Sequence, residues 1–291
     1  MDTMRDIRNR MKRVRQPKQV TGALKLISTS KLRKARRRLE DTLPYFDGIS
    51  DAMRDIIAHS EENSHEKWFD TRSRKVDRKV ATLVITADMG KAGGYNHSII
   101  RYVEEHFPAG SFLMPVGNVG KRYFMEKDYV LVEDFTVSTK EPTVYEAKEV
   151  ASFAAGQFLE GKIDEFHVVY TRMRSIIQLE PTMQTLLPLD SKVLVKEGET
   201  ESPDTATYRY LPSQEGLFDV LVPQYLKGIV YGALVSAFAS EQAARMTAMD
   251  AATKNAEEML GRLNLRYNRA RQSAITSEVS EIVAGASALE D

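Results

Sequence analysis

Residues 226–251 read LKGIVYGALVSAFASEQAARMTAMDA, and this stretch decides the fold. Apolar residues recur there at steps of three and four, which is the spacing of one face of an α-helix. Many of them are alanines, whose small side chains let a second helix approach closely. The helical pattern covers residues 213–288 and would exceed roughly 90 Å. Ser213 is suited to the N-cap, and Pro223 lies early, where it starts or bends the helix.

A second long helical pattern covers residues 4–58. Its apolar stripe has near-heptad spacing and comprises Met4, Ile7, Met11, Val14, Ala23, Leu24, Ile27, Leu32, Ala35 and Leu39. Pro17 and Gly22 interrupt the pattern, and because an interior proline costs about 3 kcal/mol and a glycine about 1 kcal/mol, we expect a kink or local loosening there. The simplest way to bury both stripes is an antiparallel coiled coil of the two terminal helices. The far part of the longer helix would then need a partner protein.

Between the two helices the pattern changes to short β-rich runs that alternate with helical stretches. The expected strands are 79–86, 111–117, 129–135, 165–171 and a last one near 184–189. This alternation predicts a Rossmann-like α/β domain with a mostly parallel sheet. Residues 197–205 are acidic and indicate a surface loop. The expected parts are a helix over 1–58, a linker over 59–75, an α/β domain over 76–205 and a helix over 206–291.

The composition excludes several classes of function. The 291-residue chain has 41 basic and 41 acidic residues, so its net charge gives no general argument for nucleic-acid binding. It has no cysteine, which excludes disulfides and thiolate catalysis, and its five histidines show no ligand-like spacing, so we expect no metal and no cofactor. No run of about 18 apolar residues and no secretory signal are present, so we expect no membrane span.

The charge is unevenly distributed, because the first 40 residues carry fourteen basic and three acidic side chains. Such a helix repels itself unless a partner neutralises it. Three interpretations stay open: a solvated face, a nucleic-acid arm, and a basic surface that meets an acidic protein. No aromatic residue is interleaved for base stacking, which counts against the second.

Residues 83–96, LVITADMGKAGGYN, look at first like a phosphate-binding loop after a strand. The lysine precedes the paired glycines, however, and no serine or threonine follows it. The stretch therefore matches neither G-x-x-x-x-G-K-[ST] nor G-x-G-x-x-G. Asp88 is the only nearby candidate for a general base. A nucleotide-binding enzyme is thus the disfavoured alternative.

We instead expect this loop to be a tight turn between a strand and a helix. The residues expected to form it are Gly90, Gly93 and Gly94, with positive φ, and Asn96, which would cap the following helix. Tyr95 is expected to pack against the core, and Lys91 has no assigned role.

Several long motifs resemble the gamma subunit of F-type ATP synthases. They are IRNRMKRVRQPKQVTGALKLISTSKLRKA (7–35), TADMGKAGGYN (86–96), SEQAARMTAMDAATKNAEEML (240–260) and LRYNRARQSAITSEVSEIVAGASAL (265–289). They occur in order and cover both ends and the middle of the chain. The resemblance implies a rotating central stalk whose coiled coil turns inside a hexamer of alternating alpha and beta subunits. It couples ion flow through the membrane c ring to ATP synthesis or hydrolysis at the beta-subunit sites.

The resemblance also implies partners, a location and contact residues. The partners are the alpha and beta subunits, the epsilon subunit and the c ring, and the location is the cytoplasmic face of the bacterial cell membrane, as a peripheral, non-catalytic subunit. The implied beta-subunit contacts are Arg271, Gln272 and Thr276, together with the basic residues Lys31, Arg33, Lys34 and Arg36. Glu241, Gln242 and Arg245 either pack within the coil or face beta. For each of these, an ordinary exposed helix residue is the alternative.

The sequence departs from the family pattern at a few positions. Gly22 stands where the family commonly has lysine, and Leu211 stands where many members have glutamate. These departures put one basic contact and one polar rotor contact in doubt. The sequence does not indicate the coupling ion, the net direction of operation or how epsilon inhibits the complex.

Overall fold

The computed structural model describes residues 3–58, 67–69, 78–132, 137, 139–190, 211 and 213–290. The chain forms two compact units: one of residues 1–29 with 245–291, the other of residues 30–244. Helix α1 (Met4–Ala58) and helix α6 (Gln214–Glu290) each run through both units.

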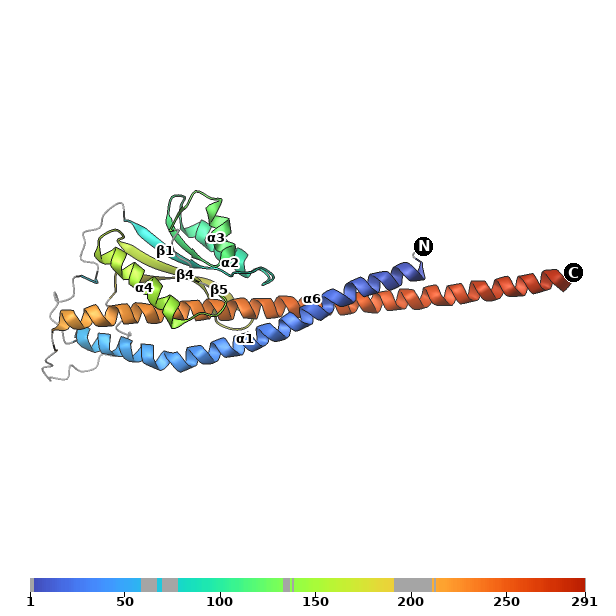
Figure 1. Ribbon diagram of the computed structural model, residues 1–291, viewed down its shortest axis with the longest axis horizontal. Helices are drawn as coiled ribbons and strands as arrows, with labels where there is room; N and C mark the ends of the chain where they lie inside the picture. Colours follow the sequence, from blue (N-terminus) through green and yellow to red (C-terminus); the bar gives the residue numbers. More distant parts are fainter. Residues whose placement is uncertain are drawn as a thin grey trace. The chain divides into compact units, whose positions relative to one another are not determined.

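The α/β domain lies in the unit of residues 30–244. Its elements are β1 (Val80–Ile85), α2 (Tyr95–His106), β2 (Phe112–Val116), α3 (Asn118–Met125), β3 (Val130–Leu131), α4 (Val144–Leu159), β4 (Glu165–Met173) and β5 (Leu179–Leu187). The five strands have the order β3-β2-β1-β4-β5 (Figure 1). Only β5 is antiparallel to its neighbour. The predicted α/β class with a mostly parallel sheet is confirmed.

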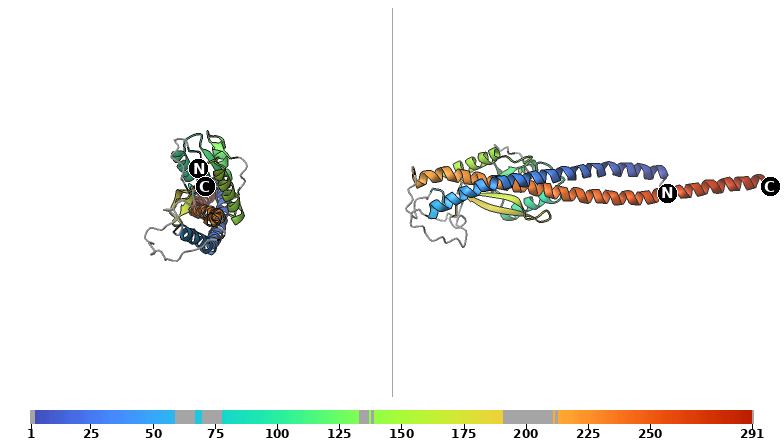
Figure 2. Two further views of the ribbon diagram at one scale, coloured as in Figure 1. Left: turned by 90° about the vertical axis from the view of Figure 1, so that its left-hand side faces the viewer. Right: turned by 90° about the horizontal axis from the view of Figure 1, so that it is seen from below.

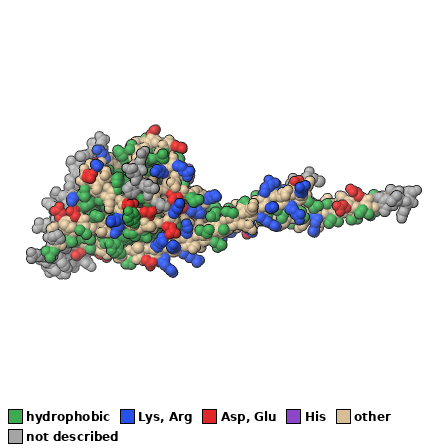
Figure 3. All heavy atoms as spheres, viewed as in Figure 1, with side chains coloured by type: hydrophobic (Ala, Val, Ile, Leu, Met, Phe, Trp, Pro, Cys, Tyr) green, Lys and Arg blue, Asp and Glu red, His purple; other side chains and the backbone are tan. Residues whose placement is uncertain are grey.

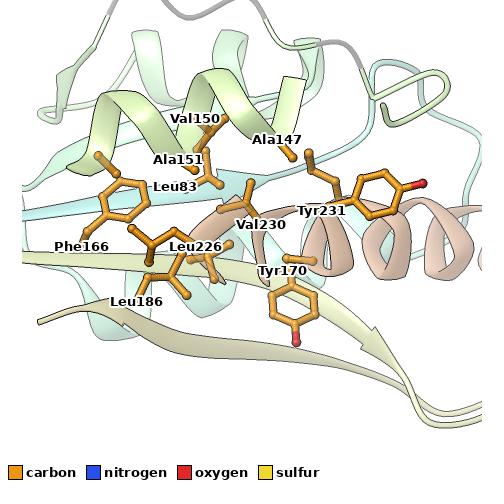
Figure 4. Packing of buried hydrophobic residues seen from close by; sticks show 14 of the residues in the cluster. Leu83, Ala147, Val150, Ala151, Phe166, Tyr170, Leu186, Leu226, Val230 and Tyr231 are labelled. Atoms are coloured by element: carbon orange, nitrogen blue, oxygen red, sulfur yellow. The ribbon is translucent and has the colours of Figure 1, made fainter. Parts of the chain in front are cut away.

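Each face of the sheet has its own core, because successive side chains of a strand point to opposite faces. Leu83 and Phe166 pack with α4, α6 and α1 on one face, whereas Val84 and Val169 pack with α2 and α3 on the other. Figure 4 shows side chains of α4 and α6 meeting those of the strands in the first core. Figure 2 gives two further views of these layers.

The last strand differs from the prediction. An apolar run near 184–189 was expected, but β5 spans Leu179–Leu187 and forms a hairpin with β4. Its first half is polar and half exposed, so it lacks the apolar pattern that signals a strand. Pro181 is tolerated there because β5 is an edge strand. On the side of an edge strand that has no neighbour, a residue without a backbone N–H loses no hydrogen bond of the sheet.

The two terminal helices match their predicted ranges closely. The backbone N–H of Gly216 donates to Ser213 Oγ at 3.1 Å, which confirms the predicted N-cap. The helix α1 is continuous through Pro17 and Gly22, so the expected loosening does not break it. The helix α6 likewise continues through Pro223.

One stretch within Glu215–Ala284 is long and apolar enough to cross a membrane, by length and composition. Half of it is buried inside the protein, and core helices pass the same test, so it is weak evidence for a membrane span.

The predicted linker and the acidic loop lie mostly outside the described residues. Within the linker, Trp68 is 3% exposed and stacks on Phe158. Its Nε1–H donates to Asp219 of α6 at 3.0 Å. Trp68 thus ties the chain between α1 and β1 to the core. The acidic segment 197–205 is not among the described residues.

Candidate functional site

The glycine-rich loop joins β1 to α2, and its backbone differs from the prediction. Of the three glycines expected to have positive φ, Gly93 alone does, at 56°. Lys91 takes the other positive φ, at 65°, where a side chain costs roughly 1–2 kcal/mol. Gly94 has a φ of −81°. The expectation for Gly90 and Gly94 is wrong, because the turn reverses at Lys91 and Gly93 only.

Asn96 has a different role from the predicted helix cap. Helix α2 follows Gly94, and no side chain caps it. Asn96 Oδ1 instead accepts a hydrogen bond from the backbone N–H of Ala87 at 2.9 Å. The residue therefore ties the start of α2 to the end of β1. Tyr95 is 5% exposed, which confirms its predicted packing role.

Helix α6 lies where doubly wound sheets bind ligands. The strand order places β2 on one side of β1 and β4 on the other, so the switch point lies at the carboxyl ends of β1 and β4. Ala244 of α6 packs against Ala87 and Tyr95 of the loop after β1. Ser240 Oγ donates to the Thr171 carbonyl of β4 at 2.9 Å. Ala87 and Tyr95 thus form a socket that is occupied by α6. Because α6 fills the place where a ligand would bind, the nucleotide-binding alternative is disfavoured.

Two further contacts hold this socket, and the sequence analysis missed both. Asp88 accepts hydrogen bonds from the backbone N–H groups of Asn118 and Thr139, each at 3.2 Å, so the candidate base is a structural anchor. Gly117 lies so close to Thr86 that a Cβ would collide with the Thr86 carbonyl. The only signal in the sequence was a glycine immediately before a short helix.

The predicted basic cluster lies on the outer face of α1, in the unit of residues 30–244. Its members are Lys31, which is half-buried, and the exposed residues Arg33, Lys34 and Arg36. Leu32 and Ala35, 5% and 3% exposed, turn the opposite face into the core. Figure 3 shows Lys and Arg side chains gathered along α1.

Glu141, in the segment before α4, pairs with this face of α1. Its Oε2 lies 3.4 Å from Arg38 Nη2 and 3.7 Å from Lys34 Nζ. The sequence contained no signal for this contact, because the two segments are about a hundred residues apart.

In the other unit, a polar seam joins α1 to α6. It consists of the ion pair Lys18–Glu257 at 3.0 Å, the hydroxyl pair Thr21–Thr253 at 2.8 Å and the ion pair Lys25–Asp250 at 2.6 Å. The positions 18, 21 and 25 ascend along α1 while their partners 257, 253 and 250 descend along α6, which is the numbering of an antiparallel coiled coil. Hydrogen bonds from Lys25 and Lys254 lower the pKa of Asp250.

The seam corrects part of the predicted apolar stripe of α1. Ile27 is 52% exposed and Ala23 is also exposed, whereas Ser28 is 1% exposed. Polar residues make these contacts with α6, and the apolar residues Ala23 and Ile27 beside them face outward. A search for apolar periodicity cannot find a polar seam. Ile7, 5% exposed, does lie in the coil as predicted.

The predicted contact residues near the end of α6 are exposed. Arg271, Gln272 and Thr276 are all exposed, as are most residues of this stretch. Thr276 Oγ1 donates to the Gln272 carbonyl at 2.9 Å. Ile275 and Ile282 are also 52% and 71% exposed. This stretch of α6 thus offers polar and apolar groups together.

The three residues of the SEQAARM motif lie deeper. Glu241 and Gln242 are 6% and 3% exposed, and Arg245 is half-buried. The first two therefore pack within the protein, which favours the first of the two roles considered. Among the described residues, no group of three or more His, Cys, Asp or Glu side chains could hold a metal ion.

The chain is similar to ATP synthase proteins over nearly its full length. The family model described as ATP synthase matches residues 3–289. An ATP synthase gamma chain from Ruminiclostridium cellulolyticum is 45% identical, with 99% of each chain covered. A sodium ion specific ATP synthase gamma chain from Acetobacterium woodii is 36% identical, again with 99% of each chain covered.

The fold is similar to that of two solved assemblies. A chain of the mitochondrial ATP synthase of Euglena gracilis has a TM-score of 0.66 and 17% identity, covering 98% of this chain and 94% of that one. A chain of the Tetrahymena thermophila central stalk and c-ring structure has a TM-score of 0.57 and 24% identity, covering 80% of this chain and 99% of that one.

Proposed function

The chain belongs to the ATP synthase gamma chain family, and from this premise we propose that it is a rotor that performs no bond chemistry itself. Its terminal helices turn inside a hexamer of alternating alpha and beta subunits. Ion flow through a membrane c ring supplies the torque. The changing face of the shaft drives each beta-subunit site through binding, synthesis and release of ATP.

The observation that carries this proposal is the exposed end of α6. Val279 and Ile282 are 55% and 71% exposed, although the same helix is almost fully buried around Val230. Exposed apolar side chains in a row need a partner surface. Since few directional hydrogen bonds form at such a surface, the helix can turn against it.

Two sets of polar residues are our proposed contacts with the beta subunits. Arg271, Gln272 and Thr276 form the first set, and their exposure leaves them available to a partner loop. The basic cluster of α1 forms the second, facing an acidic surface of beta. Glu241 and Gln242 are not proposed as contacts because they are buried.

The remaining partners follow from the same premise. The α/β domain and the nearby ends of α1 and α6 bind the epsilon subunit and the c ring. The chain is then a peripheral protein at the cytoplasmic face of the bacterial membrane. Leu211, which stands where many family members have glutamate, is 73% exposed. A polar contact with the rotor is therefore not proposed at this position.

Reconstitution tests the proposal. The full chain alone should hydrolyse no ATP, and with alpha and beta subunits it should form a stable complex with higher ATPase activity than alpha and beta alone. Failure to copurify with them, or micromolar binding of ATP by the isolated chain in calorimetry, would contradict the proposal.

A further inference from the structure

A small hollow lies where α1, α6 and the segment before α4 meet. Val235 and Phe238 of α6, which are 2% and 6% exposed, line its base. Lys34 and Arg38 of α1 stand at its rim, and Glu141 enters from the third side. Cations beside apolar side chains form a site suited to a carboxylate carried by an amphipathic protein segment.

The backbone around Glu141 is held on both sides. On one side, the N–H of Thr139 donates to Asp88 at 3.2 Å. On the other, Pro142 is buried, and Thr143 caps α4 in a reciprocal capping box with Glu146. The carboxylate is therefore presented to α1 by an ordered segment, at little cost in backbone entropy.

The charges around the hollow are unbalanced. Six cations and no acid occupy residues 31–38 of α1, KLRKARRR. Among the described residues, the ion pairs of this stretch go to the single oxygen Oε2 of Glu141. Lys34, Arg38 and Glu141 are 60%, 36% and 51% exposed at the side chain, and pairs as exposed as these are weak and easily displaced.

We propose that Glu141 is an internal counter-ion that occupies the place of a beta-subunit carboxylate on α1. The proposal rests on the function proposed above, and it adds that Glu141 competes with the beta subunit for Lys34 and Arg38. In the free chain Glu141 neutralises part of the basic cluster. When an acidic segment of beta approaches, its carboxylate displaces Glu141 from Lys34 and Arg38. The internal pair thereby lowers the affinity of the shaft for beta and eases release during rotation.

The test compares Glu141→Gln with Glu105→Gln in the full chain. Glu105 is a matched control, because its side chain is also 51% exposed and pairs with Arg101 of the same domain. The measured quantity is the chain concentration that half-restores ATPase activity to alpha and beta subunits, at low and high salt. We expect Glu141→Gln to lower it about two- to fivefold at low salt, and the gain to fade near 0.5 M salt as charges are screened.

A second pair of variants links the effect to its cause. In a chain carrying Lys34→Gln and Arg38→Gln, adding Glu141→Gln should change the half-restoring concentration by less than about 1.5-fold. The inference is overturned, with the proposed function intact, when Glu141→Gln behaves as Glu105→Gln or weakens assembly. When the unchanged chain itself fails to assemble with alpha and beta subunits, the proposed function fails first.

Discussion

Gly117 lies against the backbone of Thr86, where the turn into α3 begins. Its φ is 90°, and a Cβ would collide with the Thr86 carbonyl. Thr86 Oγ1 meanwhile donates to the Val116 carbonyl and accepts from the N–H of Gly120, both at 2.9 Å. This contact sets the spacing between β1 and α3 and leaves no room for an additional atom.

Gly117→Ala should therefore destabilise the protein by about 3 kcal/mol or more, since a positive φ and a backbone collision add. Gly110→Ala is the matched control, because Gly110 has a φ of 85° but nothing within 4 Å of its Cβ position. It should cost only about 1–2 kcal/mol. Urea unfolding followed by circular dichroism measures both, and equal losses would show that the collision is relieved.

His167 is buried in β4 between two partners. Its Nε2 lies 3.0 Å from Glu165 Oε2, and its Nδ1 lies 3.0 Å from Thr185 Oγ1. Arg78 in turn pairs with Glu165 at 2.6 Å. Burial lowers the pKa of His167, and the neighbouring Glu165 offsets this only in part. The imidazole is therefore neutral in the folded protein near pH 7.

This lowered pKa predicts an acid-dependent loss of stability. The unfolded imidazole binds a proton below pH of about 6.5, whereas the folded one resists protonation. The stability that the neutral His167 side chain contributes is therefore fully present above that pH, and it is lost as the pH falls toward the pKa of His167 in the folded protein. His167→Gln should flatten the dependence of the unfolding free energy on pH between 7.5 and 5.5, measured in urea. An unchanged slope would assign the loss to other groups.

Helices α6 and α1 approach each other closely at Gly228. A Cβ on Gly228 would collide with the ring of Phe46, whereas a Cβ on Gly232, one turn later, would meet nothing within 4 Å. The same substitution should therefore have opposite effects at two neighbouring positions.

Gly232→Ala should stabilise the protein by about 0.5–1 kcal/mol, because alanine restricts the unfolded chain and favours the helix. Gly228→Ala should instead destabilise it by about 1–3 kcal/mol through overpacking against Phe46. Thermal unfolding of both variants checks this difference, and a gain at both positions would show that Phe46 moves aside without cost.

The polar seam sets the register of the coiled coil. The Thr21–Thr253 hydroxyl pair has an ion pair on each side of it. A shift of one helix along the other would break all three pairs at once, so the seam favours a single register.

A double-mutant cycle of Thr21→Val and Thr253→Val should give a coupling energy of about 0.5–1.5 kcal/mol. Thr29→Val is the control, because the Thr29 hydroxyl bonds only to Lys25 in its own helix. It should show no coupling to Thr253→Val in urea unfolding. Purely additive effects of Thr21→Val and Thr253→Val would mean that the hydroxyl pair adds nothing to the register.

For the whole molecule, the proposed rotor needs a polar contact that forms with one beta subunit at a time. Replacing both Arg271 and Gln272 with alanine should lower ATP turnover of the assembled complex about tenfold, the loss of about 1.4 kcal/mol from a charge-assisted contact. Assembly should persist, because the remaining surface contacts are many and weak. Arg266→Ala is the control, because Arg266 is exposed and lies five and six residues before Arg271 and Gln272, more than about 100° away around α6. Unchanged turnover would show that this contact is absent.

Local pattern was sufficient for most elements. The range of α1, the alternation of strands and helices, and the cap at Ser213 were predicted because periodicity and capping act over a few neighbouring residues. The edge strand β5 was misplaced because half of it is polar. The loop after β1 was recognised as a turn, but the positive φ at Lys91 was not predicted, because lysine by itself rarely adopts the left-handed conformation.

The sequence by itself determined the two long helices, the α/β class and the family, since each follows from local spacing or from long motifs. It also placed Arg271 and Gln272 within such a motif. Only the tertiary structure decided that α6 fills the socket beside Tyr95, and that Glu141 pairs with Lys34. Those contacts join segments far apart in the chain, and their energy depends on distances that no local pattern contains.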